Sequence, residues 1–126
     1  ELIWRHKLAF LDIPEIATPT RIYAPLVRYL TKRIPILGMA HITGGGIPGN
    51  LPRCMPKGLQ PLVDWNSWEI PDIFNKIMVA GDISKEEMWR VFNMGIGYCI
   101  IVSEDYVKDA MSLIGNDCWT IGEVVV

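Results

Sequence analysis

The chain has 126 residues, of which half are hydrophobic and 21% are charged, as in one globular domain and unlike a disordered chain. Its apolar runs are too short to span a bilayer, and residues 1–10 lack the long apolar core of a signal peptide. The net charge is −2, but residues 1–58 carry eight Lys and Arg against three Asp and Glu, whereas residues 59–126 carry four against eleven. The basic residues are scattered and have no interleaved aromatics, which argues against a nucleic-acid partner. The basic part contains a glycine-rich turn, which suits a small phosphorylated ligand.

The first half of the chain predicts two helices and one strand. Residues 1–10 are predicted to form a short helix, followed by a loop with two prolines and an extended segment over residues 18–23. Pro25 can begin the next helix, which Pro35 ends. The apolar face of that helix comprises Leu26, Val27, Leu30 and Ile34. Residues 36–42 are then predicted to form a strand that ends at a glycine-rich turn.

Three consecutive glycines at residues 44–46 form this turn. Because they have no Cβ atoms, the backbone can take positive φ angles and a ligand can approach its N–H groups. Pro48 suits the first position of a short helix, and N–H groups at a helix start favour an anion such as phosphate. The alternative is a flexible turn without a ligand. His41 before the turn and Arg53 after it favour the functional interpretation.

The second half of the chain predicts helices between strands. Strands are predicted at residues 61–65, 98–102 and 118–126. Helices are predicted from Pro71 to Gly81, from a capping box at Ser84, and from a cap at Ser103 to Gly115, with Val91 and Met111 on their inward faces. The strand at residues 98–102 is the most apolar and is predicted to be central in the sheet. This order predicts an α+β domain with a mixed sheet flanked by helices.

Several residues outside the turn are open to two interpretations. His41 is either a satisfied structural residue at the strand end or a group that orients or deprotonates a ligand. Asn50 and Arg53 lie one short helical turn apart and can face the same ligand, although a surface salt bridge is the alternative for Arg53. Residues 93–97 lack the third glycine of a dinucleotide fingerprint, which favours a strand entry packed against another backbone. The tryptophans Trp65, Trp68 and Trp89 are interpreted as core or interface aromatics.

The three cysteines carry little functional signal. Cys54, Cys99 and Cys118 show no CxxC spacing, and each lies in an apolar context. They are interpreted as reduced core residues of a cytoplasmic protein. No cluster with metal-ligand spacing is recognisable, so the sequence predicts no metal site in this chain.

Several segments match one family in order. They are residues 19–23, residues 40–46 with Asn50, Pro52 and Arg53, then Asp64, residues 68–74, 86–88, 92–97 and 121–124. On these residues the chain resembles the C-terminal domain of the aminoimidazole ribonucleotide synthetase family, also called the phosphoribosylformylglycinamidine cyclo-ligases. The His-x-Thr-Gly-Gly-Gly run with its downstream Asn and Pro-Arg is the most specific part of the resemblance.

The resemblance implies an ATP-dependent ring closure in purine biosynthesis. Formylglycinamidine ribonucleotide and ATP would give aminoimidazole ribonucleotide, ADP and phosphate. The family activates the formyl oxygen as a phosphate ester, which is expelled when an internal nitrogen closes the ring. His41 is the implied catalytic residue. The implied substrate-binding residues are Thr43, Gly44, Gly45, Gly46, Asn50 and Arg53, and the implied cleft residues are Thr20, Arg21, Asn93 and Gly95.

The family's ATP site lies mainly in an N-terminal domain, which also forms the dimer and is not recognisable in this chain. We therefore expect residues 1–126 to be a single C-terminal-type synthetase domain. Its expected partners are the missing N-terminal domain and, in the full-length homodimer, a second copy, with ATP and Mg²⁺ bound mainly through the missing domain. The first and last residues fall inside predicted elements, so we expect a fragment that is inactive alone and has an apolar docking face.

Two alternatives stay open from the sequence. The chain could be a non-catalytic phosphate-binding module that acts only as a partner domain, or a domain of another synthetase of the same ATP-binding superfamily. An adjoining ATP-binding half would favour the enzyme, and its absence would favour the module. The nucleotide-sugar substrate that protects the complete protein from unfolding would distinguish one synthetase from another.

Overall fold

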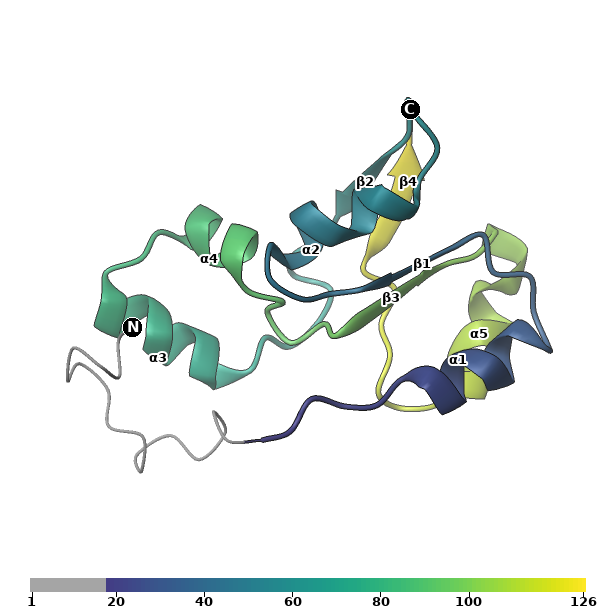
Figure 1. The fold of residues 1–126 in the computed structure, drawn as a ribbon, viewed down its shortest axis with the longest axis horizontal. Helices are drawn as coiled ribbons and strands as arrows, with labels where there is room; N and C mark the ends of the chain where they lie inside the picture. The colour runs from purple at the N-terminus through teal and green to yellow at the C-terminus, as the bar shows by residue number, and fades with distance from the viewer. Residues whose placement is uncertain (1–17) are drawn as a thin grey trace.

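A computed structural model describes residues 18–126, and the helix predicted over residues 1–10 lies outside them. The described chain alternates short helices with short strands, so the predicted α+β class is confirmed (Figure 1). The α-helices are α1 (Ala24–Thr31), α2 (Gly46–Asn50), α3 (Asp72–Gly81), α4 (Lys85–Val91) and α5 (Val107–Ile114). The strands are β1 (Gly38–His41), β2 (Gln60–Val63), β3 (Tyr98–Ile101) and β4 (Gly122–Val125), and the 3-10 helices are η3 (Leu51–Cys54) and η4 (Glu104–Tyr106).

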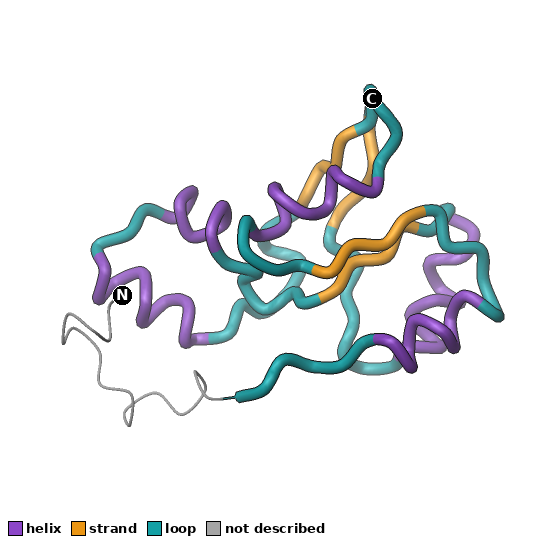
Figure 2. The backbone as a smooth tube through the Cα atoms, in the orientation of Figure 1, coloured by secondary structure: helices purple, strands orange, loops and turns teal. Residues whose placement is uncertain are grey.

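The strands pair as two separate antiparallel ribbons, β1 with β3 and β2 with β4 (Figure 2). These ribbons replace the predicted single mixed sheet, and β3, predicted to be central, pairs only with β1 among the described residues. The reason lies in the two faces of β3. The side chain of Cys99 belongs to one hydrophobic cluster, and that of Ile100 packs against another. A strand covered on both faces has a continuous apolar sequence even when only one of its edges is paired.

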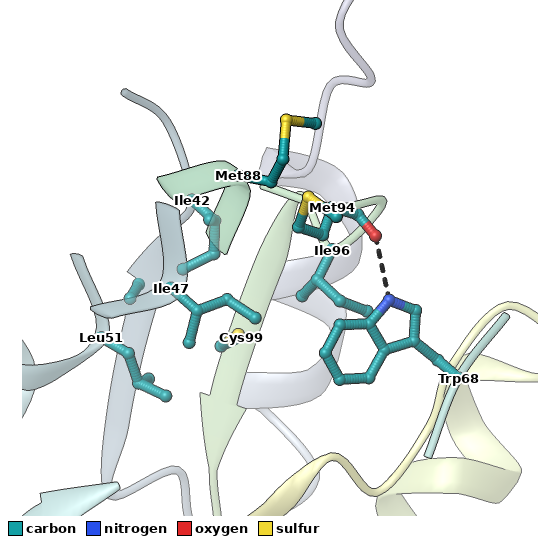
Figure 3. Close-up of a cluster of buried hydrophobic side chains, with 9 residues drawn as sticks. Ile42, Ile47, Leu51, Trp68, Met88, Met94, Ile96 and Cys99 are labelled. Carbon is teal, nitrogen blue, oxygen red and sulfur yellow. Dashed lines mark hydrogen bonds between the residues drawn. The ribbon is translucent and has the colours of Figure 1, made fainter. Parts of the chain in front are cut away.

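The larger hydrophobic cluster gathers residues of β1, β3, α2 and α4 (Figure 3). Met88 of α4, one of its members, is 0% exposed. The Trp68 Nε1–H donates to the Met94 carbonyl at 3.0 Å, the dashed line in Figure 3, so the polar atom of this buried indole is satisfied. Of the two predicted alternatives, core or interface, Trp68 is thus a core residue. Trp65 and Trp89 lie beside the cluster and stack on each other, with ring centroids 4.3 Å apart.

Helices α1 and α5 enclose a second hydrophobic cluster. It lies near the end of the ribbon at which β1 begins and β3 ends (Figure 1). Its buried residues are Leu30, Ile34 and Ala110, as predicted. Met111 is 39% exposed, against the prediction, because the face of α5 that packs into this cluster comprises Ala110, Leu113 and Ile114, and Met111 lies beyond its edge. Val91 was also predicted to face inward, but as the last residue of α4 it is 43% exposed.

The predicted cap at Ser84 and the predicted stop at Gly115 are confirmed, and the predicted cap at Ser103 is not. The Ser84 hydroxyl accepts from the Glu87 N–H at 3.3 Å and caps α4. Gly115, with φ 91°, ends α5. Ser103 makes no side-chain capping bond, because the chain after it first forms η4 and begins the α-helix only at Val107.

Helix α2 begins at Gly46, two residues before the predicted start at Pro48. Its N-cap Gly45 and its first residue Gly46 have φ angles of 99° and 61°, so the turn continues directly into the helix. A Cβ atom at Gly46 would overlap the carbonyl oxygen of Trp89 and lie 2.7 Å from that of Phe92. Glycine at this position therefore allows α2 to pack against the end of α4.

We expect Gly46→Ala to lower the free energy of unfolding by about 2–5 kcal/mol, because the left-handed backbone costs about 1–2 kcal/mol and overpacking about 1–3 kcal/mol more. Gly44→Ala is the matched control, since no atom lies within 4 Å of a Cβ placed there. Denaturant unfolding of both variants measures the difference. Equal free energies of unfolding would contradict this account of the α2–α4 contact.

Candidate functional site

The glycine-rich turn after β1 contains backbone N–H groups that have no acceptor among residues 18–126. The Gly46 N–H donates to the Thr43 carbonyl at 3.1 Å and closes the turn, and the Gly49 N–H donates to the Gly45 carbonyl at 3.0 Å. Within residues 18–126, neither the Gly44 N–H nor the Gly45 N–H donates to another residue. Thr43 and Gly44 are exposed. Successive open N–H groups in a turn of this kind can accept an anion.

Asn50 holds the turn from inside. Its side chain is only 6% exposed, and its Nδ2 donates to the carbonyls of Thr43, Gly44 and Gly46 at 3.3, 3.2 and 2.8 Å. Its Oδ1 accepts from the Thr43 hydroxyl at 3.5 Å. The carbonyl groups of the turn therefore point toward the protein, where Asn50 satisfies them. In this structure the side chain of Asn50 shapes the turn.

His41 is the last residue of β1, and its side chain is exposed. Its imidazole ring lies 6.0 Å from the ring of Tyr98, its register partner on β3, and 5.7 Å from the ring of Tyr23, which it meets edge-on. The two tyrosine rings are 5.2 Å apart. His41 thus belongs to an aromatic cluster with Tyr23 and Tyr98, and an exposed imidazole there is accessible to a ligand.

Sequence reasoning missed both tyrosines as neighbours of His41. Tyr23 lies within one of the segments that carry the family resemblance, which is the one available signal. The place of Tyr98 depends on the pairing of β1 with β3, which residues distant in the sequence determine together. No local pattern in either segment encodes that contact.

Asn93 and Gly95 form the turn that leads into β3. The Asn93 Oδ1 accepts from the Gly95 N–H at 2.9 Å, and a Cβ at Gly95 would collide with the ring of Pro71. The glycines of this segment therefore serve close packing, as the second interpretation of the sequence predicts. The packing partner at Gly95 is a side chain and not a backbone.

Thr20, Arg21 and Arg53, the remaining predicted site residues, are exposed. Arg21 pairs with Asp117 at 3.6 Å, a surface ion pair of the kind that contributes about 0–1 kcal/mol. Arg53 lies on η3, directly after α2, whereas the side chain of Asn50 is buried in the turn. The structure brings Thr43, the three glycines and Asn50 together in one turn.

A groove of about 390 Å³ is lined by residues of α1, β2, β3, β4 and α5, most of them aliphatic or aromatic. Arg21 and Gly95 line it, together with Tyr23 and Tyr98. His41 and the glycine-rich turn do not line it. The two tyrosines are therefore shared by the groove and the aromatic cluster, and they connect one to the other.

Residues 13–126 match the family described as AIR synthase related protein, C-terminal domain. The chain belongs to this family. It is 50% identical over 116 residues to the phosphoribosylformylglycinamidine cyclo-ligase of Prochlorococcus marinus strain MIT 9211, which covers 89% of the chain and 34% of the relative. The corresponding relative of Carboxydothermus hydrogenoformans is 48% identical over 113 residues, or 87% of the chain and 33% of the relative. The chain thus spans about a third of the length of the curated relatives it matches.

The described part of this AIR synthase-related domain offers no cluster of metal ligands, and its buried thiol at Cys99 is unreactive. Residues 18–126 contain no group of three His, Cys, Asp or Glu side chains that could hold a metal ion. All three cysteines are free, as predicted. Cys99 lies in the core and Cys54 packs partly buried against it, but Cys118 is partly exposed and belongs to neither hydrophobic cluster, against the prediction. Burial, followed by the influence of Cys54, raises the pKa of Cys99 to about 12, so this thiol stays protonated at neutral pH. None of the helices in this part is long and apolar enough to cross a membrane.

We expect Asn50→Ala to destabilise the domain by about 2–4 kcal/mol, because the buried carbonyl of Gly46 and the partly buried carbonyls of Thr43 and Gly44 lose their donor. Asn75→Ala is the matched control, since Asn75 is an exposed residue of α3. Thermal or denaturant unfolding measures both. Similar stability for the two variants would mean that the Asn50 side chain does not hold the turn.

Proposed function

We propose that this domain is part of a longer ATP-dependent cyclo-ligase of purine biosynthesis. The enzyme would convert formylglycinamidine ribonucleotide and ATP to aminoimidazole ribonucleotide, ADP and phosphate. The observation that carries the proposal is that relatives about half identical over nine-tenths of the chain are named phosphoribosylformylglycinamidine cyclo-ligase. Their names favour the enzyme over a non-catalytic partner module.

The proposed role of the glycine-rich turn is to bind the ribose phosphate of the substrate. Two observations support it: the N–H groups of Gly44 and Gly45 have no acceptor within residues 18–126, and Asn50 turns the carbonyl groups away from the ligand side. Thr43 is exposed beside them, and its hydroxyl would have to leave its 3.5 Å contact with Asn50 Oδ1 to donate to a ligand. The exposed guanidinium of Arg53 follows on η3 and would supply positive charge near a bound dianion.

The proposed role of His41 is to orient or deprotonate the substrate near the closing ring. Ring closure requires that a nitrogen attack the formyl carbon and lose a proton while the formyl oxygen leaves with phosphate. A neutral imidazole can accept that proton or hold the nitrogen in place. Its exposed position at the end of β1, directly before the turn, supports this role.

ATP and Mg²⁺ are assigned to the rest of the longer protein. Residues 18–126 offer no metal-ligand cluster, so the side chains that hold Mg²⁺ would come from outside this segment. The proposed partners are an N-terminal ATP-binding domain and, through it, a second copy in a homodimer. The proposed location of the full-length enzyme is the cytoplasm. We expect this domain alone to be inactive, because it lacks the proposed ATP-binding domain.

The proposed phosphate binding at the glycine-rich turn can be tested by placing a side chain at Gly44. Gly44→Val is expected to raise the KM of the full-length enzyme for formylglycinamidine ribonucleotide by about 10–100-fold, because loss of one or two hydrogen bonds to a charged group costs about 1.5–3 kcal/mol. Folding should be preserved, since a Cβ at Gly44 meets no atom within 4 Å, whereas Gly45 has a φ of 99° that a side chain would strain. Gly49→Ala is the control with open space and no expected change in KM. An unchanged KM in Gly44→Val would place the phosphate elsewhere.

His41→Asn is expected to lower kcat of the full-length enzyme by about 10²–10⁴-fold while substrate binding is retained, as is typical when an acid–base or orienting group is lost. Because His41 is exposed, its replacement should change the unfolding temperature little. Steady-state kinetics and thermal unfolding measure the two effects. Near-normal kcat together with a marked loss of stability would support a structural role instead.

A further inference from the structure

The aromatic cluster of Tyr23, His41 and Tyr98 joins three segments that are far apart in the sequence. Tyr98 is placed by the backbone, because it is the register partner of His41 in the β1–β3 ladder. The Ile42 N–H donates to the Gly97 carbonyl at 2.9 Å, so the pairing continues one step beyond both residues. Strand pairing on both sides of this position therefore holds the Tyr98 ring beside the imidazole.

The position of Tyr23 depends on Gly97 and not on strand pairing. A Cβ atom added at Gly97 would overlap the Tyr23 hydroxyl, so the tyrosine fills space that a side chain at Gly97 would otherwise occupy. The guanidinium of Arg21 lies 5.9 Å from the centre of the Tyr23 ring and pairs with Asp117. Glycine at position 97 thus lets a residue that precedes α1 reach the end of β1 and touch His41.

We propose that Tyr23 and Tyr98 are positioning residues that fix the orientation of the His41 imidazole. The three separations, 5.2, 5.7 and 6.0 Å, lie within the range of about 4.5–7 Å in which aromatic rings attract one another. An exposed histidine without such neighbours samples several rotamers. The restraint follows from the geometry, and its consequence for catalysis rests on the proposed function of His41.

The test uses the full-length enzyme and two independent readouts. Tyr98→Leu and Tyr23→Leu each remove one ring, and Tyr98→Phe retains it. Tyr29→Leu is the matched control, because Tyr29 is a 41% exposed residue of α1 whose ring lies against Arg33. Acylation of His41 by diethyl pyrocarbonate, followed by peptide mass spectrometry, reports the freedom of the ring independently of activity. The values of kcat and KM for formylglycinamidine ribonucleotide are measured on the same samples.

Both leucine variants are expected to acylate several-fold faster at His41 and to lose about tenfold to a hundredfold in kcat at unchanged KM, since a misplacement of about 1 Å can cost about 10²-fold in rate. Tyr98→Phe should keep the acylation rate of His41 and kcat at their wild-type values, because the ring and not the hydroxyl restrains the imidazole. Tyr29→Leu should change neither. If Tyr98→Leu does not fold, Tyr98→Val supplies a ring-free residue that is well suited to a strand.

An unchanged rate of His41 acylation in folded, ring-free variants would overturn the proposal. If His41→Asn still lowers kcat in that case, the proposed function stands without the positioning role. Faster acylation with unchanged kcat would instead retain the restraint on His41 and reject the catalytic role of this histidine. If Tyr98→Phe behaved like Tyr98→Leu, the proposal would also be contradicted, since the restraint on His41 would then come from the tyrosine hydroxyl.

Discussion

The pairing of β1 with β3 is the interaction on which the rest of the domain depends. One face of this ribbon contributes Ala40 and Cys99 to the larger cluster, and the other contributes Ile100 to the cluster closed by α1 and α5. The same pairing sets His41 opposite Tyr98. Because side chains alternate across a strand, a shift of one residue in register would exchange the two faces and separate the aromatic cluster. The register of β1 against β3 thus determines both the packing of the core and the arrangement of the candidate site.

The glycine-rich turn divides its polar groups between two sides. The carbonyl groups are satisfied by a buried amide from the following helix, Asn50, and two N–H groups are left for the outer side. Gly46 fixes the base of the turn against the end of α4. The donor geometry is therefore set by packing beneath the turn before any ligand arrives, which is the condition under which backbone groups bind an anion well.

Local signals in the sequence predicted what depends on neighbouring residues. The Ser84 cap, the stop at Gly115 and the inward side of α1 follow from chemistry within one helical turn. The start of α2 and the division of the strands into two ribbons could not be predicted, because the contact of Gly46 with α4 and the pairing of β3 join distant segments. The candidate site divides in the same way: the turn and His41 are visible in the sequence, and their supporting residues are not.

Two-stranded ribbons have no central strand, so each strand described within residues 18–126 is an edge strand. Each described strand has one partner, so each presents a row of unpaired N–H and C=O groups on its other side. Pro61 removes one donor from β2, whereas β4 carries Val124, which is 37% exposed. Unpaired edges with apolar side chains add strands from other chains readily. Within residues 18–126, the second edges of these strands are therefore the places where a further strand would extend a sheet most directly.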